Sequence, residues 1–180
     1  MRPLSVCLLG GAVAVVLASS AEHASANGPE DVRSVFFVSK SENKNQVHYG
    51  VHLDERCAPA GDTPVFAYWR MFERGAHAVE ALLDRELAAY GLLEQHVLSR
   101  GERGGVVRVV LRALPSRPVL VTTFVRSDTC AATASLVIDG TPATLASIHA
   151  KLRWPFGVDH LLLSGRALSD GRAVTEKISP

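Results

Sequence analysis

The sequence has 180 residues, of which 47% are hydrophobic and 21% charged, with a formal net charge of +1 at pH 7. A near-neutral chain lacks the strongly basic domain or dense basic stripe that nucleic-acid binding calls for, which excludes nucleic acid from the expected partners. The length suits one domain with a real hydrophobic core and is short for two.

The first 26 residues have the pattern of a cleavable secretory signal peptide. A positive start at Arg2 precedes an apolar run from Leu4 to Leu17, and the small residues Ala24-Ser25-Ala26 follow. The alternative, a membrane anchor, needs about 20 apolar residues, and this run is shorter. We therefore expect cleavage between Ala26 and Asn27, and an exported protein, periplasmic or secreted, with no membrane span after cleavage.

The rest of the chain, residues 33–180, is predicted to form a single β-rich domain. Short runs rich in Val, Phe, Thr, Ile and Leu alternate with Gly, Pro, Asn and Asp, which is typical of β-strands joined by turns. The polar stretch from Ser169 onward is expected to fray. We expect strands at Ser34 to Ser39, Gln46 to Asp54, Pro64 to Phe72, Leu92 to Ser99, Gly105 to Ala113, Val119 to Arg126, Ala131 to Asp139, Thr144 to Arg153 and Val158 to Leu168.

Turn residues separate these strands. Asn43-Lys44-Asn45 favours a hairpin between the first two strands, because Asn tolerates the left-handed backbone conformation of tight turns. Further turns are expected at Gly101 to Gly104, Pro115 to Pro118, Asp139-Gly140 and Pro155 to Gly157.

One amphipathic helix is predicted from about Ala76 to Tyr90, because its apolar residues recur at helical spacing, and Gly91 is a fitting terminator. Most connections between strands are too short for parallel βαβ units. The predicted fold is therefore mainly β, an antiparallel barrel or sandwich of roughly eight to nine strands with this one helix.

Two cysteines, Cys57 and Cys130, follow the predicted cleavage site. An even pair in an oxidising compartment favours a disulfide. The alternative is two unrelated thiols, one in a loop and one in a strand, because spacing along the chain does not show how close the two Cβ atoms lie.

Several segments together resemble a known family. They are Val35 to Ser41 (VFFVSKS), Asn43 to Tyr49 (NKNQVHY), Pro64 to Trp69 (PVFAYW) and Leu87 to Gly91 (LAAYG). Their order is similar to the bacterial family called domain of unknown function 4833. The resemblance implies an exported bacterial single-domain protein and carries over no catalytic residue.

Two histidines, His48 and His52, lie four residues apart beside Asp54. On a strand that spacing separates them by about 13 Å, too far to share one zinc ion, whose ligands lie about 2 Å away. No metal or other cofactor is predicted, and no catalytic residue is assigned, because neither a G-x-S-x-G elbow nor an H-E-x-x-H helix is present. A secreted or periplasmic hydrolase using His48 or His52 remains an alternative.

The aromatic segment around Tyr68, Trp69 and Arg70 is the main candidate for ligand binding. It is either a core strand or, in the functional interpretation, an aromatic wall and a guanidinium at a barrel mouth. Our leading hypothesis is a non-enzymatic exported β-domain that binds a small amphipathic ligand or a cell-envelope component. A structural or accessory envelope protein without a ligand is a further alternative.

Overall fold

The computed structural model of the chain describes residues 34–74, 78–153 and 157–179. The predicted signal peptide, its cleavage site and the start of the domain at residue 33 lie outside these residues. Most of the predicted turn from Pro155 to Gly157 also lies outside them.

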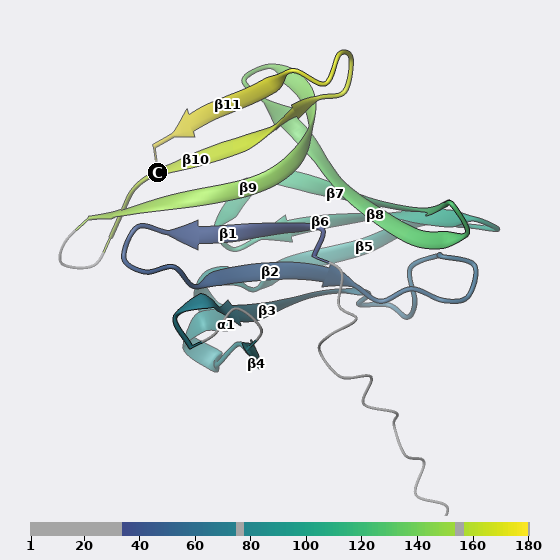
Figure 1. The fold of residues 1–180 in the computed structure, drawn as a ribbon, viewed down its shortest axis with the longest axis horizontal. Helices are drawn as coiled ribbons and strands as arrows, with labels where there is room; N and C mark the ends of the chain where they lie inside the picture. Colours follow the sequence, from purple (N-terminus) through teal and green to yellow (C-terminus); the bar gives the residue numbers. More distant parts are fainter. Residues whose placement is uncertain (1–33, 75–77, 154–156, 180) are drawn as a thin grey trace, which may run out of the picture.

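The described residues form a mainly β fold with one α-helix, α1, and one 3-10 turn, η2 (Figure 1), which confirms the predicted fold class. The described residues contain eleven strands, two more than the sequence predicts, because β4 and β11 were not expected. The elements are β1 (Phe36–Lys40), β2 (Gln46–Val51), β3 (Val65–Met71), η2 (Phe72–Arg74), β4 (Ala78–Ala81), α1 (Asp84–Tyr90), β5 (Leu92–Gly101), β6 (Gly104–Leu111), β7 (Leu114–Arg126), β8 (Thr129–Ile138), β9 (Thr141–Arg153), β10 (Gly157–Ala167) and β11 (Ala173–Ile178).

All eleven strands belong to one mixed sheet with β9 at its centre. Along one edge of β9, the first half pairs with β8 and the second half with β1. Along the other edge β9 pairs with β10, which in turn pairs with β11. The β1–β9 pairing is parallel, so the sheet is not purely antiparallel as predicted. Since β1 and β8 share one edge of β9, the sheet divides there into two limbs.

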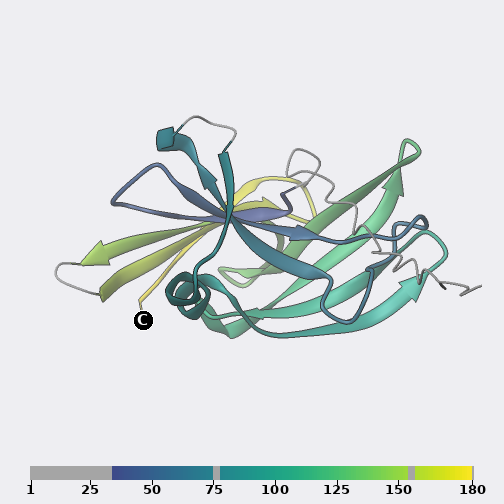
Figure 2. The same ribbon diagram turned by 90° about the horizontal axis from the view of Figure 1, so that it is seen from below.

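The first limb (β1 to β4) and the second limb (β5 to β8) face each other across the core (Figure 2). The two limbs do not close into a barrel, so of the two predicted architectures the sandwich-like one fits the structure. β3 and β5 are not paired through their backbones, and the Gln95 side chain of β5 connects them instead. Its amide accepts a hydrogen bond from the Val65 N–H (2.9 Å) and donates one to the Val65 carbonyl (3.1 Å).

The core follows from the alternation of side chains along the strands. Phe36 and Val38 of β1 point inward against Val47 and Tyr49 of β2, and Phe36 stacks on Tyr49 with ring centroids 4.5 Å apart. The second limb contributes inward side chains of β6 to β8 to the same core: Val107, Val109, Leu111, Val119, Val121, Ala134, Leu136 and Ile138.

The helix is shorter than predicted, since it begins at Asp84 and not near Ala76. Of the predicted first half, Ala78–Ala81 instead forms β4, which pairs with β3. The helical spacing of the apolar residues predicted too early a start for the helix. Leu82 is buried while Leu83 is 59% exposed, so the two do not share one apolar face. Gly91 does end the helix, but with a negative φ; a Cβ there would collide with the Leu87 carbonyl.

Two further predictions of strand limits were wrong. The turn lies at residues 112–113, not at Pro115 to Pro118, and both prolines belong to β7. They are tolerated because the register pairs Leu114 and then resumes at Val119, so their missing N–H groups cost no ladder bond to β6. The stretch after Ser169 does not simply fray, because its residues from Ala173 pair with β10 as β11.

Candidate functional site

An apolar cavity of about 650 Å³, here called the end cavity, opens at the end of the molecule where α1 lies. α1 and the C-terminal ends of β9 and β11 lie at this same end in both views (Figures 1 and 2). Its volume falls within the roughly 300–1,000 Å³ typical of small-molecule sites. The cavity is lined by Val38, Ala88, Ala89, Tyr90, Arg112, Ala113, Leu114, Pro115, Ser116, Ala150, Leu152, Val158, Leu161, Ile178 and Ser179.

The end cavity exists because small side chains face one another at this end. Ala88 and Ala89 form the wall contributed by α1, and Ala150 lies in the opposing wall. Next to Ala150, the sheet register places Leu161 and Ile178 side by side on β10 and β11. The helix buries none of its own residues, so its apolar side chains remain available to a ligand.

Hydrogen bonds hold the last turn of α1 at the cavity wall. The Tyr49 hydroxyl donates to the Tyr90 carbonyl at 2.6 Å, and burial raises the pKa of Tyr49 above its usual range. The Tyr90 ring meets the Trp69 ring edge-on at 5.9 Å. The Arg112 N–H donates to the Gly91 carbonyl at 3.0 Å, which ties the β6–β7 turn to the end of the helix.

Of the described residues that line the end cavity, Arg112 is the only charged one. It is exposed, which places it at the rim, and it makes no ion pair with a described residue. The other polar side chains of the lining are the phenol of Tyr90 and the hydroxyls of Ser116 and Ser179. The site therefore combines an apolar interior with a few polar groups that include one free cation.

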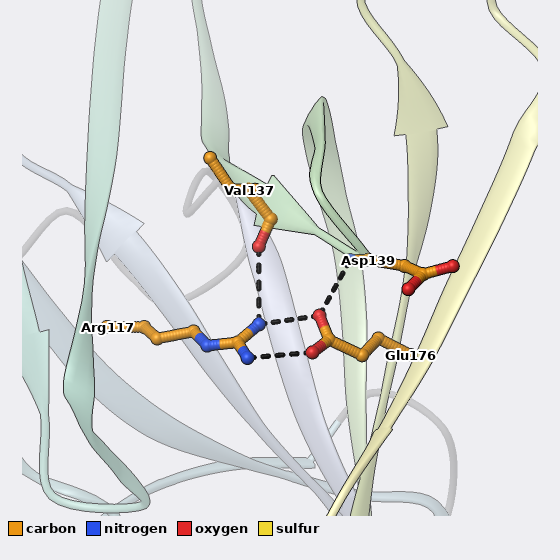
Figure 3. A network of polar contacts seen from close by, with 4 residues as sticks. All are labelled: Arg117, Val137, Asp139 and Glu176. Atoms are coloured by element: carbon orange, nitrogen blue, oxygen red, sulfur yellow. Dashed lines mark hydrogen bonds and ion pairs between the residues drawn. The ribbon is translucent and has the colours of Figure 1, made fainter.

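A second cavity of about 590 Å³, the side cavity, lies between β7, β8 and β11 and includes exposed Leu120, Val137 and Leu168. Its main charges are already satisfied (Figure 3). Arg117 donates two hydrogen bonds to Glu176, at 2.5 and 2.7 Å, and a longer one of 3.4 Å to the Val137 carbonyl. Glu176 also accepts from the Asp139 N–H at 2.7 Å, and these bonds lower its pKa to about 2.

The histidine that the sequence singles out, His48, lies on the outer face of the first limb within a chain of hydrogen bonds. Its Nδ1 lies 2.7 Å from the Ser34 hydroxyl and its Nε2 lies 2.9 Å from Oε1 of Gln46. A neutral ring with its proton on Nε2 satisfies both, accepting from Ser34 and donating to Gln46. Burial, with Arg70 adding to it, lowers the pKa of His48 to about 4, which makes the ring a weak general base at neutral pH.

His52 does not join His48. It stacks on Phe66 with centroids 4.2 Å apart and is exposed. In the described part of the chain, no three or more His, Cys, Asp or Glu side chains are grouped so as to hold a metal ion.

Tyr68, Trp69 and Arg70 are not brought together on one wall. Tyr68 and Arg70 lie on the outer face of β3 near His48, while Trp69 points inward and belongs to the core. Trp69 also lines a small cavity of about 190 Å³ with Lys40, whose Nζ lies 5.8 Å from the ring centroid. None of the three lines the end or side cavity, and ligand binding by them stays a prediction.

The residues that line the end cavity were missed by sequence reasoning. Arg112 and Ala113 were placed within a strand, although they form the turn between β6 and β7. The one available signal was the small-residue run Ala88-Ala89 beside Tyr90 in the last turn of the helix, because a helix face of alanines leaves space against its neighbour. Nothing in the sequence shows that β9, β10 and β11 provide the opposite wall.

Cys57 and Cys130 form a disulfide, with Cα atoms 5.1 Å apart. It joins the loop between β2 and β3 to the start of β8. No helix among the described residues is long and apolar enough to cross a membrane. The disulfide is compatible with an exported protein.

These features define a class: a single-sheet β-protein folded on itself around a hydrophobic core, with a disulfide at one end and an apolar cavity at the other. The chain belongs to the family described as domain of unknown function DUF4833, whose model matches residues 36–177. This confirms the resemblance inferred from the sequence. Searches of curated proteins and of solved structures gave no match to this chain.

Proposed function

We propose that this protein is an exported binding protein whose end cavity holds the apolar part of a small amphipathic ligand. The observation that carries the proposal is the cavity itself, about 650 Å³ in volume and lined mostly by aliphatic side chains. Empty apolar surface of this extent is unfavourable in water, and an apolar ligand removes it from solvent at a gain of roughly 25 cal/mol per Å².

The end cavity is a better site than the side cavity because of its polar groups. A binding site typically has an apolar wall with a few polar groups that orient the ligand. In the side cavity, Arg117 and Glu176 neutralise each other, so a ligand would have to compete with a bidentate ion pair. At the end cavity, Arg112 and the hydroxyls at the rim remain available.

The test is titration of the purified, disulfide-bonded protein with the neutral fluorescent probe N-phenyl-1-naphthylamine, which brightens in apolar sites. We expect saturable binding at one site. Ala89→Trp should lower the affinity about tenfold or more, because the indole fills space that the wall of α1 leaves open.

Two matched variants control for the added indole. Ala173→Trp places it on an exposed position of β11 that lines neither cavity, and Val137→Trp places it in the side cavity. Both should bind the probe as the unmodified protein does. Loss of binding in Val137→Trp with none in Ala89→Trp would move the site to the side cavity and overturn the proposal.

A further inference from the structure

We infer that the end cavity selects amphiphiles with an anionic head group on a single alkyl chain, and that Arg112 is the residue that recognises the head group. This inference rests on the proposed function and names its ligand class. The shared chemistry is a carboxylate or phosphate joined to one flexible chain.

The first argument is the balance of charge at the cavity. Among the described residues, the lining includes Arg112 and no carboxylate side chain. By contrast, Arg117 at the side cavity is paired with Glu176. A cation at an apolar rim without a counter-charge favours an anion and disfavours a ligand cation.

The second argument is the position of the acidic residues of α1. Asp84 and Glu86 lie in the first turn, whereas the cavity is lined by the last turn. The Glu86 carboxylate is also engaged, since it accepts a hydrogen bond from the Leu83 N–H at 2.8 Å. The helix therefore places no carboxylate beside Arg112 along the cavity wall.

Three carbonyls at the end of α1 already have donors. The Tyr90 carbonyl accepts from the Tyr49 hydroxyl, and the Gly91 carbonyl accepts from the Arg112 N–H. The Leu87 carbonyl accepts from the Gly91 N–H. The negative end of this helix is therefore partly satisfied within the protein.

The third argument is the geometry of the donors. The Arg112 backbone is fixed in a two-residue turn, and the side chain on it is exposed at the rim. A guanidinium binds carboxylate or phosphate through two parallel N–H bonds, which an alcohol head cannot reproduce. The hydroxyls of Ser116 and Ser179 line the same cavity and can donate to a second oxygen of the anion.

The volume limits the ligand to one chain. A cavity of about 650 Å³ holds a drug-sized molecule, which a single-chain amphiphile is and a two-chain phospholipid is not. The interior contributed by Val38, Leu114 and Leu161 offers no polar side-chain atom, so the chain should be unsubstituted along the buried part.

The experiment compares probes with the same ten-carbon chain by isothermal titration calorimetry below their aggregation concentrations. The probes are decanoate, monodecyl phosphate, decan-1-ol and decyltrimethylammonium, each titrated into the protein, Arg112→Gln and Arg103→Gln. Arg103 is the control, because it is exposed in the β5–β6 turn and does not line either cavity.

We expect decanoate or monodecyl phosphate to bind about tenfold more tightly than decan-1-ol, and decyltrimethylammonium to bind most weakly. In Arg112→Gln the anion should bind about tenfold less tightly while the alcohol is unchanged, and Arg103→Gln should match the unmodified protein. The anion preference should also weaken as salt rises, because the head group sits at an exposed rim. The stronger anion identifies which of the two head groups the site takes.

The two proposals fail differently. If all four probes bind with similar affinity and Arg112→Gln changes nothing, the anion inference is wrong while the proposed function stands. If no probe binds, or if Ala89→Trp leaves binding of every probe intact, the proposed function fails and this inference with it.

Discussion

The two ends of the molecule bring the limbs together in different ways. At one end, the Cys57–Cys130 disulfide joins the β2–β3 loop to β8, and the Arg100 side chain donates to the carbonyls of Pro59 (3.0 Å) and Gly61 (2.6 Å). At the other end, the limbs meet through α1, and the main direct bond is that of the Tyr49 hydroxyl to the Tyr90 carbonyl.

The difference also appears in how tightly side chains fill the space. At the disulfide end Cys57, Ala58 and Pro59 are buried. A Cβ added to Gly105 would run into the Pro59 ring. At the α1 end the helix buries no residue and the end cavity remains open. One end is therefore closed by a covalent bond and by packed side chains, whereas the other keeps an open apolar cavity.

Removing the disulfide should give the largest effect and should separate the two ends most clearly. Replacing both cysteines, Cys57→Ala with Cys130→Ala, should lower the free energy of unfolding by about 3–4 kcal/mol, because the bond closes a loop with a sequence separation of 73. Urea unfolding measures the loss. Probe affinity at the end cavity should change little, and a parallel loss of affinity would show that the two ends are not independent.

Loss of the Tyr49 hydroxyl should have the next largest effect, at the open end. Tyr49→Phe leaves the Tyr90 carbonyl without its donor and should cost about 1–2 kcal/mol. Because that bond fixes the last turn of α1, probe affinity should fall as well, which the disulfide variant should not show. Phe36→Leu, a core change beside the same ring, serves as a control that lowers stability without removing the bond.

Much of the fold was predictable from local patterns. Asp139-Gly140 and Gly101 to Gly104 do form turns, and at Asp139 and Gly140 both φ angles are positive, as a tight hairpin requires. The hairpin at Asn43-Lys44-Asn45 joins β1 and β2 as predicted. These turns are determined by the backbone preferences of a few adjacent residues, which can be read from the sequence.

What the sequence did not show depends on partners distant in the chain. The parallel pairing of Val38 with Ile148 follows from both limbs meeting at β9, which no local pattern encodes. The same holds for the end cavity, whose walls come from Ala89, Arg112 and Ile178. Tyr68 and Trp69, by contrast, were noticed because they are adjacent aromatic residues, although alternation places them on opposite faces of β3.

A smaller effect should follow from breaking the ion pair shown in Figure 3. Glu176→Gln should lower the free energy of unfolding by about 1 kcal/mol, since the pair is partly exposed. The loss of stability should be local to the open end, because Glu176 and Ile178 both belong to β11 and Ile178 lines the end cavity. Hydrogen exchange should accelerate in β11 and not in the β7–β8 hairpin beside the disulfide.

The same variant changes the pH dependence of stability. The pKa of Glu176 is lowered from 4.5 to about 2, so its contribution is fully present above about pH 4.5 and is lost as the pH falls towards 2. Chemical unfolding at pH 6, 4 and 3 should therefore show a steeper loss in the unmodified protein than in Glu176→Gln. Equal slopes would mean that the carboxylate is not held by Arg117 in solution.

A last prediction concerns His48, which belongs to neither end. The folded protein keeps this ring neutral down to a pKa of about 4, whereas the unfolded chain takes up a proton near 6.5. The neutral ring thus contributes stability that is complete above about pH 6.5 and lost as the pH falls to 4. In His48→Gln the slope of unfolding free energy between these pH values should be shallower, while the relative affinities of the end cavity for its probes stay as they are at pH 7. A slope unchanged by the substitution would show that His48 titrates normally in the folded protein, and that the chain from Ser34 to Gln46 does not hold it neutral.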